Sequence, residues 1–280
     1  MPPVCRLRLA LGALSNPHFD MGLVPLRTLH AEYLPRYAGL FDALELSETL
    51  YGDELPERVV GWRDQAPAGF RFMPKLHKGI VQAEEKGDAE LKEAAAHLET
   101  LGALGDHMGP MLAQFPPSFH NEGDHLAWLE SLLALPLPAS CPGWAVELRH
   151  PSWWQPEVEK ALRRAGAALV WSTHHKAFAP SWATGRFGYV RFVGKHHAAG
   201  ARRAVTKEDR TEDLLELRQR LAAPPARWNE CYVIVTNTWE GNAIDSLPKV
   251  AAGLGQMELA QRLRRRPGET LLEQPAPSSG

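Results

Sequence analysis

Short apolar runs typical of buried β-strands alternate along the chain with longer stretches of helical periodicity. The strand-type runs are brief and rich in branched and aromatic residues, and they cover residues 6–11, 41–46, 70–73, 111–115, 144–148, 168–171, 188–193 and 231–235. Between them, apolar positions recur three and four residues apart, most clearly over residues 89–101, 125–135, 156–165 and 207–221. This alternation of strand and helix predicts a parallel sheet covered by helices.

Eight strand-type runs without a break in composition favour one α/β domain, a closed (β/α)8 barrel of the TIM type. The stretch 171–187 is short and punctuated by Pro and Gly, so we expect the sixth repeat to be degenerate. We place the barrel domain at residues 1–255. Residues 256–280 are rich first in Arg and then in Pro and Ser, and we expect a disordered tail there.

The composition is that of a globular protein, with 44% hydrophobic and 23% charged residues. The 31 Lys and Arg nearly balance the 33 Asp and Glu, which argues against a generic nucleic-acid-binding surface but permits a local cationic pocket. No apolar run reaches the length of a membrane span, and the first residues lack the apolar core of a signal peptide. Three widely separated cysteines without a C-x-x-C pair are typical of a reducing compartment, so we expect a cytoplasmic protein.

Charged and amide side chains interrupt the strand-type runs near their carboxyl ends. Strand residues alternate between two faces, and the apolar residues of 144–149 fit the helix layer, which leaves Glu147 and Arg149 pointing into the barrel. The same alternation turns Tyr189 and Arg191 inward. In barrel enzymes this carboxyl rim holds the active site. The side chains that we place at the rim are Glu45, Lys75, Gln114, Glu147, Arg149, Arg191 and Asn237.

This set combines carboxylates suited to proton transfer with cations and amides suited to binding an anion. We therefore expect a metal-independent hydrolase or isomerase that acts on a small anionic or phosphorylated substrate. Glu147 or Glu45 would be the base, while Lys75, Arg149 and Arg191 would bind the anion and stabilise developing charge. A structural alternative stays open, because the same charges could form a buried ion network that only fills the barrel.

Six motifs, taken in order, resemble those of a known family. They are FDALELS at 41–47, FRFMPK at 70–75, GPMLAQFPPSF at 109–119, AVELRHPSW at 145–153, YVRFVG at 189–194 and YVIVTNT at 232–238. With them the chain resembles the YecE-like family, also called domain of unknown function 72, over nearly all of its predicted folded part. The resemblance implies a TIM-type barrel without a settled activity. It also implies a pocket built from Glu45, Lys75, Gln114, Glu147, Arg149, Trp153, Arg191 and Asn237.

The sequence departs from this family pattern at three places. Where the family's first strand ends in a turn like Gly-Thr-Ser-Gly-Trp, this chain has LGALS at 11–15. The Thr-His pair that follows the third-strand lysine is lost, since Ile80 is followed by Val81 and Gln82. Thr236 takes a place often held by Asn. If those groups take part in catalysis, this copy is altered in substrate or inactive.

We expect no metal and no cofactor. The adjacent histidines at 174–175 and 196–197 lack convergent geometry and nearby acidic partners, and no Walker loop, dinucleotide fingerprint or G-x-S-x-G elbow occurs. His150 follows Glu147 and Arg149 closely, which suits a titrating, substrate-binding group.

A second hypothesis is a non-catalytic nucleic-acid-binding or endonuclease-four-like barrel. Tryptophans at the rim that could stack on bases and the basic cluster at 262–266 support this hypothesis. It predicts binding to DNA that weakens as the salt concentration rises. A third hypothesis is a scaffold for a protein partner. The oligomeric state stays open.

Overall fold

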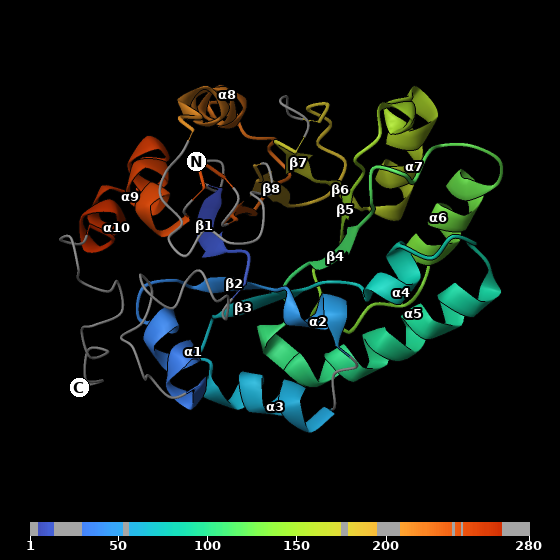
Figure 1. Ribbon diagram of the computed structural model, residues 1–280, viewed down its shortest axis with the longest axis horizontal. Helices are drawn as coiled ribbons and strands as arrows, with labels where there is room; N and C mark the ends of the chain where they lie inside the picture. Colours follow the sequence, from blue (N-terminus) through green and yellow to red (C-terminus); the bar gives the residue numbers. More distant parts are fainter. Residues whose placement is uncertain are drawn as a thin grey trace.

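The computed structural model describes residues 5–13, 30–52, 56–174, 179–194, 208–236, 239–241 and 243–264. In this part of the chain, helices surround short strands that pair in parallel (Figure 1). The α/β class with parallel strands is confirmed. The strands are β1 (Arg6–Leu11), β2 (Ala43–Leu46), β3 (Arg71–Pro74), β4 (Met111–Gln114), β5 (Trp144–Glu147), β6 (Ala168–Leu169), β7 (Trp171–Ser172), β8 (Gly188–Phe192) and β9 (Glu230–Val235).

The helices lie on the outside of these strands (Figure 1). Helix α7 matches its prediction to the residue, because Pro156 starts the helix without needing a backbone donor and Gly166 ends it with a left-handed φ of 65°. The α-helices are α1 (His30–Ala38), α2 (Glu48–Tyr51), α3 (Pro56–Gln65), α4 (Lys78–Val81), α5 (Asp88–Leu101), α6 (His125–Leu133), α7 (Pro156–Ala165), α8 (Thr211–Leu221), α9 (Ala243–Gly253) and α10 (Met257–Arg262). Two 3-10 helices, η1 (Gly102–His107) and η2 (Pro151–Trp153), complete the described set.

Backbone pairing divides the described strands into three sheets. Their orders are β1-β9-β8-β7, β2-β3 and β4-β5-β6. Isolated parallel bridges, Phe72 with Met108 and Lys75 with Leu112, join the second sheet to the third. The described residues thus form no continuous closed sheet, and the closed barrel that we predicted is not seen in their hydrogen bonding. The parallel register nevertheless brings the carboxyl ends of neighbouring strands to the same edge.

The strands bury both faces, which explains their nearly continuous apolar sequences. One face packs under the helices in the larger core, with residues such as Leu9, Leu44 and Val146. The opposite faces meet in an inner core to which strands of all three sheets contribute. Its members are Ala10, Ala43, Met73, Leu112, Ala145, Ala168, Val170, Phe187, Tyr189, Tyr232 and Ile234.

Two segments differ from their predictions for physical reasons. The sixth strand is split around Val170, because β6 pairs with β5 whereas β7 pairs with β8 in another sheet. Residues 175–178 lie outside the described part, so the degenerate sixth repeat stays a prediction. Helix α10 lies within the segment expected to be a tail, since Ala260 and Leu263 are buried in the larger core. The remainder of that tail, residues 265–280, is outside the description.

Within the described residues, none of the helices combines the length and apolar character that crossing a membrane requires. The cytoplasmic location stays a prediction.

Candidate functional site

A layer of polar positions lies on the strands directly after the inner core. Each position comes two residues after an inner-core residue, so its side chain projects to the same inner face. Counted from the last inner-core residue of each strand, every such position is polar or glycine, whereas the preceding layer is apolar or tyrosine. We call these residues the polar layer: Gly12, Glu45, Lys75, Gln114, Glu147, Ser172, Arg191 and Thr236.

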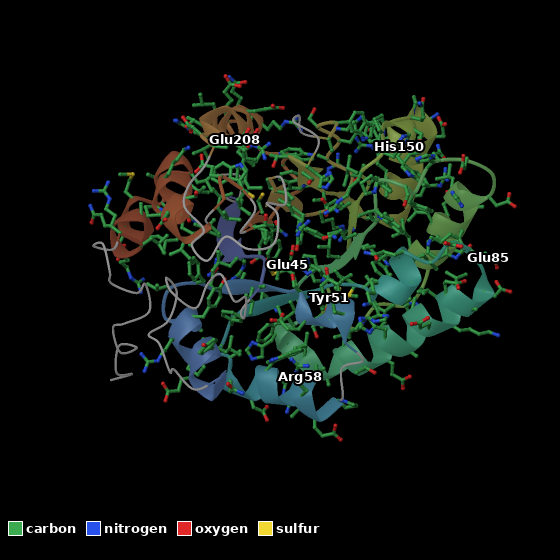
Figure 2. All side chains as sticks on the ribbon, viewed as in Figure 1. Glu45, Tyr51, Arg58, Glu85, His150 and Glu208 are labelled. Atoms are coloured by element: carbon green, nitrogen blue, oxygen red, sulfur yellow. The ribbon has the colours of Figure 1, made fainter. Side chains whose placement is uncertain are left out.

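Arg191 links the two carboxylates of the polar layer. Its Nε and Nη2 donate to Oε2 and Oε1 of Glu45, each at 2.9 Å, and its Nη1 donates to Oε2 of Glu147 at 2.7 Å. The hydroxyl of Tyr189 donates to Oε2 of Glu45 at 2.9 Å. Both carboxylates are fully buried, and Figure 2 shows Glu45 at the centre of the molecule. β2, β5 and β8 are thus tied together by one guanidinium.

Two more cations complete this network. The Nζ of Lys75 lies 2.9 Å from Oε1 of Glu45. Arg149 follows β5 and donates from Nε and Nη2 to the two oxygens of Glu147, at 3.1 and 3.3 Å. The network therefore holds three cations against two carboxylates. Among the described residues, no partner is recorded for Nη1 of Arg149.

The cations decide the protonation of the carboxylates. Burial alone would raise the pKa of Glu45, but the charges of Arg191 and Lys75 outweigh it and hold this pKa below its ordinary value. Burial also opposes ionisation of Glu147, yet Arg149 and Arg191 lower its pKa well below the usual range. Both side chains are therefore carboxylates at neutral pH. All four of their oxygens already accept hydrogen bonds, so neither is a ready base.

For Lys75 the effect of burial on the pKa outweighs the attraction of the neighbouring carboxylate. Burial lowers its pKa, the positive charge of Arg191 lowers it further, and the attraction of Glu45 offsets these effects only in part. The backbone of Lys75 is held by Thr49, whose hydroxyl accepts the Lys75 N–H at 2.8 Å and lies 2.9 Å from the Lys75 carbonyl. His97 makes a further contact with that carbonyl at 3.1 Å. Lys75 is therefore a fixed amine in a buried, cationic setting.

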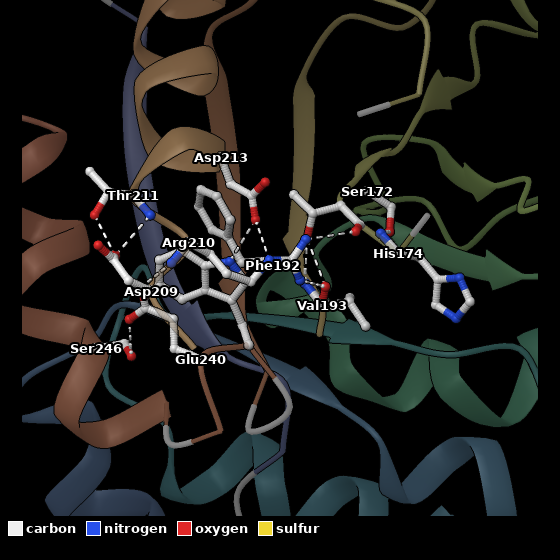
Figure 3. Close-up of polar contacts among 12 residues, drawn as sticks. Ser172, His174, Phe192, Val193, Asp209, Arg210, Thr211, Asp213, Glu240 and Ser246 are labelled. Atoms are coloured by element: carbon white, nitrogen blue, oxygen red, sulfur yellow. Dashed lines mark hydrogen bonds and ion pairs between the residues drawn. The ribbon is translucent and has the colours of Figure 1, made fainter. Parts of the chain in front are cut away.

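Arg210 stabilises the edge of the site beside β7 and β8 (Figure 3). Its guanidinium donates to the carbonyls of Val193 and Thr173, at 2.6 and 3.2 Å, and pairs with Asp213 at 2.9 Å. Thr173 and Val193 follow the strands that carry Ser172 and Arg191 in the polar layer. Arg210 thereby holds these two strand ends together.

Glu240 anchors the segment around Arg210 to helix α9. Its carboxylate accepts the backbone N–H of Arg210 at 2.9 Å and the hydroxyl of Ser246 at 2.7 Å, and it pairs with Lys249. Glu240 has a φ of 55°, a left-handed conformation that costs a residue with a side chain about 1–2 kcal/mol. Its three partners offset that cost.

The remaining predicted site residues fall into different surroundings. Gln114 lies in the polar layer opposite Glu147 in the strand register, and its Oε1 is buried without a partner in the described residues. The ring of His150 stacks on His120 with centroids 3.9 Å apart, and Figure 2 shows it far from Glu45. Trp153 is fully buried and donates to the carbonyl of Phe119 at 2.7 Å, so it packs in the core and faces no open site. Asn237 lies outside the described residues.

Sequence reasoning missed several residues of the site. Tyr189 had been placed on the inner face without a role, and Ser172 could have been found two positions after Val170 by the same alternation. Ser172 hydrogen-bonds Glu147 and contributes to its low pKa. Thr49 and Arg210 act from outside the strands, and no local pattern marks them.

The opposite end of the strands carries a second buried ion network with a different character. Arg8 donates from Nε and Nη2 to Glu230, at 2.9 and 2.7 Å, and from Nη1 to Asp42 at 2.9 Å and to the carbonyl of Gly69 at 3.2 Å. Every nitrogen of this guanidinium has a partner. Such complete pairing is what a purely structural network requires. A cavity of about 690 Å³ lies beside that end, next to Leu7, Gln256 and Met257, and it contains none of the predicted site residues.

No cluster of three or more potential metal-ligating side chains occurs in the described ranges.

The fold and the polar layer define a class of protein: a parallel α/β protein with a charged layer at the carboxyl ends of its strands. Residues 14–270 match the model of the family described as "Protein of unknown function DUF72", and the chain belongs to that family. The family resemblance predicted from the motifs is thus confirmed.

Relatives support this assignment. The chain is 31% identical over 138 residues to the protein YecE of Escherichia coli strain K12, a match that spans 47% of each chain, or about half the length of this curated relative. A DUF72 family protein of Thermotoga maritima MSB8 shares the fold with a TM-score of 0.68 and 22% identity, covering 90% of this chain and 98% of that one. One from Enterococcus faecalis V583 has a TM-score of 0.64 at the same identity and coverage.

Proposed function

We propose that the polar layer binds a small anionic or phosphorylated molecule and that the protein is an enzyme acting on it. The excess of positive charge in the buried network carries this proposal. An uncompensated buried charge costs several kcal/mol, so while Lys75 is protonated the three cations facing two carboxylates favour the entry of an anion. The contrast with Arg8, whose nitrogens are all paired, argues against a network that serves stability alone.

The described groups also suggest how the anion would be held. Arg149 is 14% exposed at its side chain, and its Nη1 has no partner among the described residues. Lys75, at 6% exposure, provides further N–H donors. Together these donors match the oxygens of a phosphate or carboxylate. An anion bound there would add acceptors to cations that otherwise share only two carboxylates.

We assign the chemistry to a different group than Glu45 or Glu147, which the sequence suggested as the base. Hydrolysis or isomerisation requires a group that exchanges a proton near neutral pH. Glu45 and Glu147 accept hydrogen bonds at every oxygen and have lowered pKa values, so we infer that they act as fixed counterions. Lys75, with its lowered pKa, is the group that we assign to proton exchange.

We also infer that the three sheets together form one eight-stranded barrel. The inner core supports this inference, because it draws residues from β1, β2, β3, β4, β5, β6, β8 and β9. Side chains from all these strands can share one core only if the strands are arranged around it. The polar layer would then be a ring at the carboxyl rim, where enzymes of this fold place their sites.

Binding of inorganic phosphate tests the proposed function. We expect phosphate to raise the melting temperature of the protein saturably at constant ionic strength, with a stabilisation of about 2.7 kcal/mol at a hundredfold excess over Kd. Arg149→Gln should weaken this effect, since it removes the extra positive charge. Arg164→Gln is the matched control, because Arg164 is 69% exposed on α7. An equal response of both variants, or none in the unmodified protein, would contradict the proposal.

A further inference from the structure

Lys75 is the only polar-layer residue whose side chain can become a nitrogen nucleophile. The guanidinium of Arg191 keeps its proton under all ordinary conditions, and the amide of Gln114 is not basic. The amine of Lys75 is nearly enclosed, with 6% of the side chain exposed, and lies 2.9 Å from Glu45. The question is therefore what chemistry this amine can perform.

Two features of its surroundings favour the neutral, nucleophilic amine. Burial removes the water that stabilises an ammonium ion, and Arg191 adds a positive charge close by; both lower the pKa of Lys75. Desolvation beside a second cation is one of the ways in which proteins activate lysine for attack on a carbonyl carbon. Glu45 orients the Nζ from one side and is itself fixed by Tyr189 and Arg191.

Lys86 shows that burial alone does not produce this arrangement. Its pKa is also lowered by burial, but its Nζ donates to the carbonyls of Ile80, Val81 and Ala83. Those acceptors use the hydrogens of an ammonium ion and leave no lone pair directed at a ligand. Lys86 also has no place in the polar layer. It is therefore a natural internal control for Lys75.

We propose that Lys75 forms an iminium with the carbonyl carbon of an anionic aldehyde or ketone bound in the polar layer. The proposal rests on the proposed function, because Arg149 would hold the anionic group. The nitrogen lone pair forms a bond to the carbonyl carbon as the carbonyl π bond breaks, and the oxygen takes up the π electrons and two protons that come from the lysine ammonium group. Loss of water then yields the iminium, so that ammonium and carbonyl become iminium and water with charge and atoms balanced. No oxidant or reductant is needed, and hydrolysis restores the lysine.

An iminium would give the site its catalytic power without a metal. A positively charged nitrogen on the former carbonyl carbon draws electrons from the neighbouring bonds, which eases removal of a proton or cleavage of a carbon–carbon bond. The nearby carboxylates of Glu45 and Glu147 would stabilise that positive charge electrostatically. The substrate class is thus a small carbonyl compound with a carboxylate or phosphate.

Reductive trapping tests the proposal on the full chain. The protein is incubated with glyoxylate or with glycolaldehyde phosphate and sodium cyanoborohydride, which reduces an iminium to a stable secondary amine. Intact-mass spectrometry counts the adducts. Peptide mapping of the labelled protein with its natural sequence locates them without the need for a variant. We expect one dominant adduct, at Lys75, formed faster than at any other lysine, because a lowered pKa leaves more of the free amine at neutral pH.

The controls separate the iminium from the anion site. Lys75→Arg should abolish the dominant adduct and Lys86→Arg should leave it unchanged, while inorganic phosphate should compete and uncharged glycolaldehyde should label slowly. If phosphate binds but labelling spreads evenly over the lysines, the iminium proposal is overturned and the proposed function stands. If phosphate neither binds nor competes, the proposed function falls as well.

Discussion

Glu45 accepts four hydrogen bonds inside the polar layer, one each from Lys75 and Tyr189 and two from Arg191. Glu45→Gln keeps the size of the side chain and removes its charge. Three cations would then face the single carboxylate of Glu147. Removing one partner of a buried ion pair typically destabilises a protein by about 3–5 kcal/mol, because the remaining charge is left uncompensated. We expect a loss of this size for Glu45→Gln.

Urea unfolding at pH 7 measures this loss as a change in the free energy of unfolding. Glu216→Gln on α8 is the matched control, since Glu216 is 44% exposed and pairs with Arg220 on the surface. Exposed pairs of this kind contribute about 0–1 kcal/mol. Equal, small effects of the two substitutions would show that the buried network does not hold the strands together.

The pH dependence of Glu45→Gln checks the electrostatic cause. The pKa of Glu45 is lower in the folded protein than in the unfolded chain, so its charge stabilises the fold above the unfolded pKa. That contribution is lost as the pH falls through the lowered folded pKa. The stability gap between variant and unmodified protein should therefore be full at pH 7 and shrink below about pH 4. A gap of constant size from pH 7 to pH 3 would refute the electrostatic explanation.

Three further predictions concern other parts of the molecule. Arg8→Met should lower the free energy of unfolding by about 1–3 kcal/mol, because its carboxylate partners are partly exposed and water would solvate them. It should leave the phosphate-induced shift unchanged, since Arg8 lies at the far end of the strands; a lost shift would contradict the separation of the two networks. Thr49→Val should cost about 1–3 kcal/mol and weaken phosphate binding in calorimetry, since it leaves the buried N–H of Lys75 unpaired; unchanged binding would show that Lys75 does not depend on this support. A labelled single-stranded oligonucleotide should show no anisotropy change at low salt, because Trp153 and Trp171 are buried and cannot stack on bases, and salt-sensitive binding would instead favour the nucleic-acid hypothesis.

The period-two pattern of the strands made most of the polar layer predictable. A charge in a strand that is buried on both faces must lie on one face or the other, and the apolar neighbours of Glu45, Glu147 and Arg191 assign them inward. The alternation predicts the face of the strand on which each side chain lies, but it does not predict which residues that side chain contacts. That Arg191 bridges both carboxylates follows from the arrangement of β2, β5 and β8, which are far apart in sequence.

Other features depend on tertiary contacts that a sequence pattern does not contain. The family resemblance implies Trp153 as a pocket residue, yet the 3-10 helix η2 turns it into the core beside Phe119. The support of Lys75 by Thr49 comes from helix α2, which follows β2. Our proposal that Lys75, and not Glu45 or Glu147, exchanges the proton likewise depends on which carboxylate oxygens already accept hydrogen bonds.

Crystals grown with tungstate, a heavy analogue of phosphate, would test the anion site most directly. The anomalous scattering of tungsten locates the anion without ambiguity. Our account predicts a peak within hydrogen-bonding distance of Lys75 Nζ and Arg149 Nη1, which is lost in crystals of Arg149→Gln. A polar layer without tungstate, with the anion bound only at surface arginines, would contradict the account and favour a network that serves the fold alone.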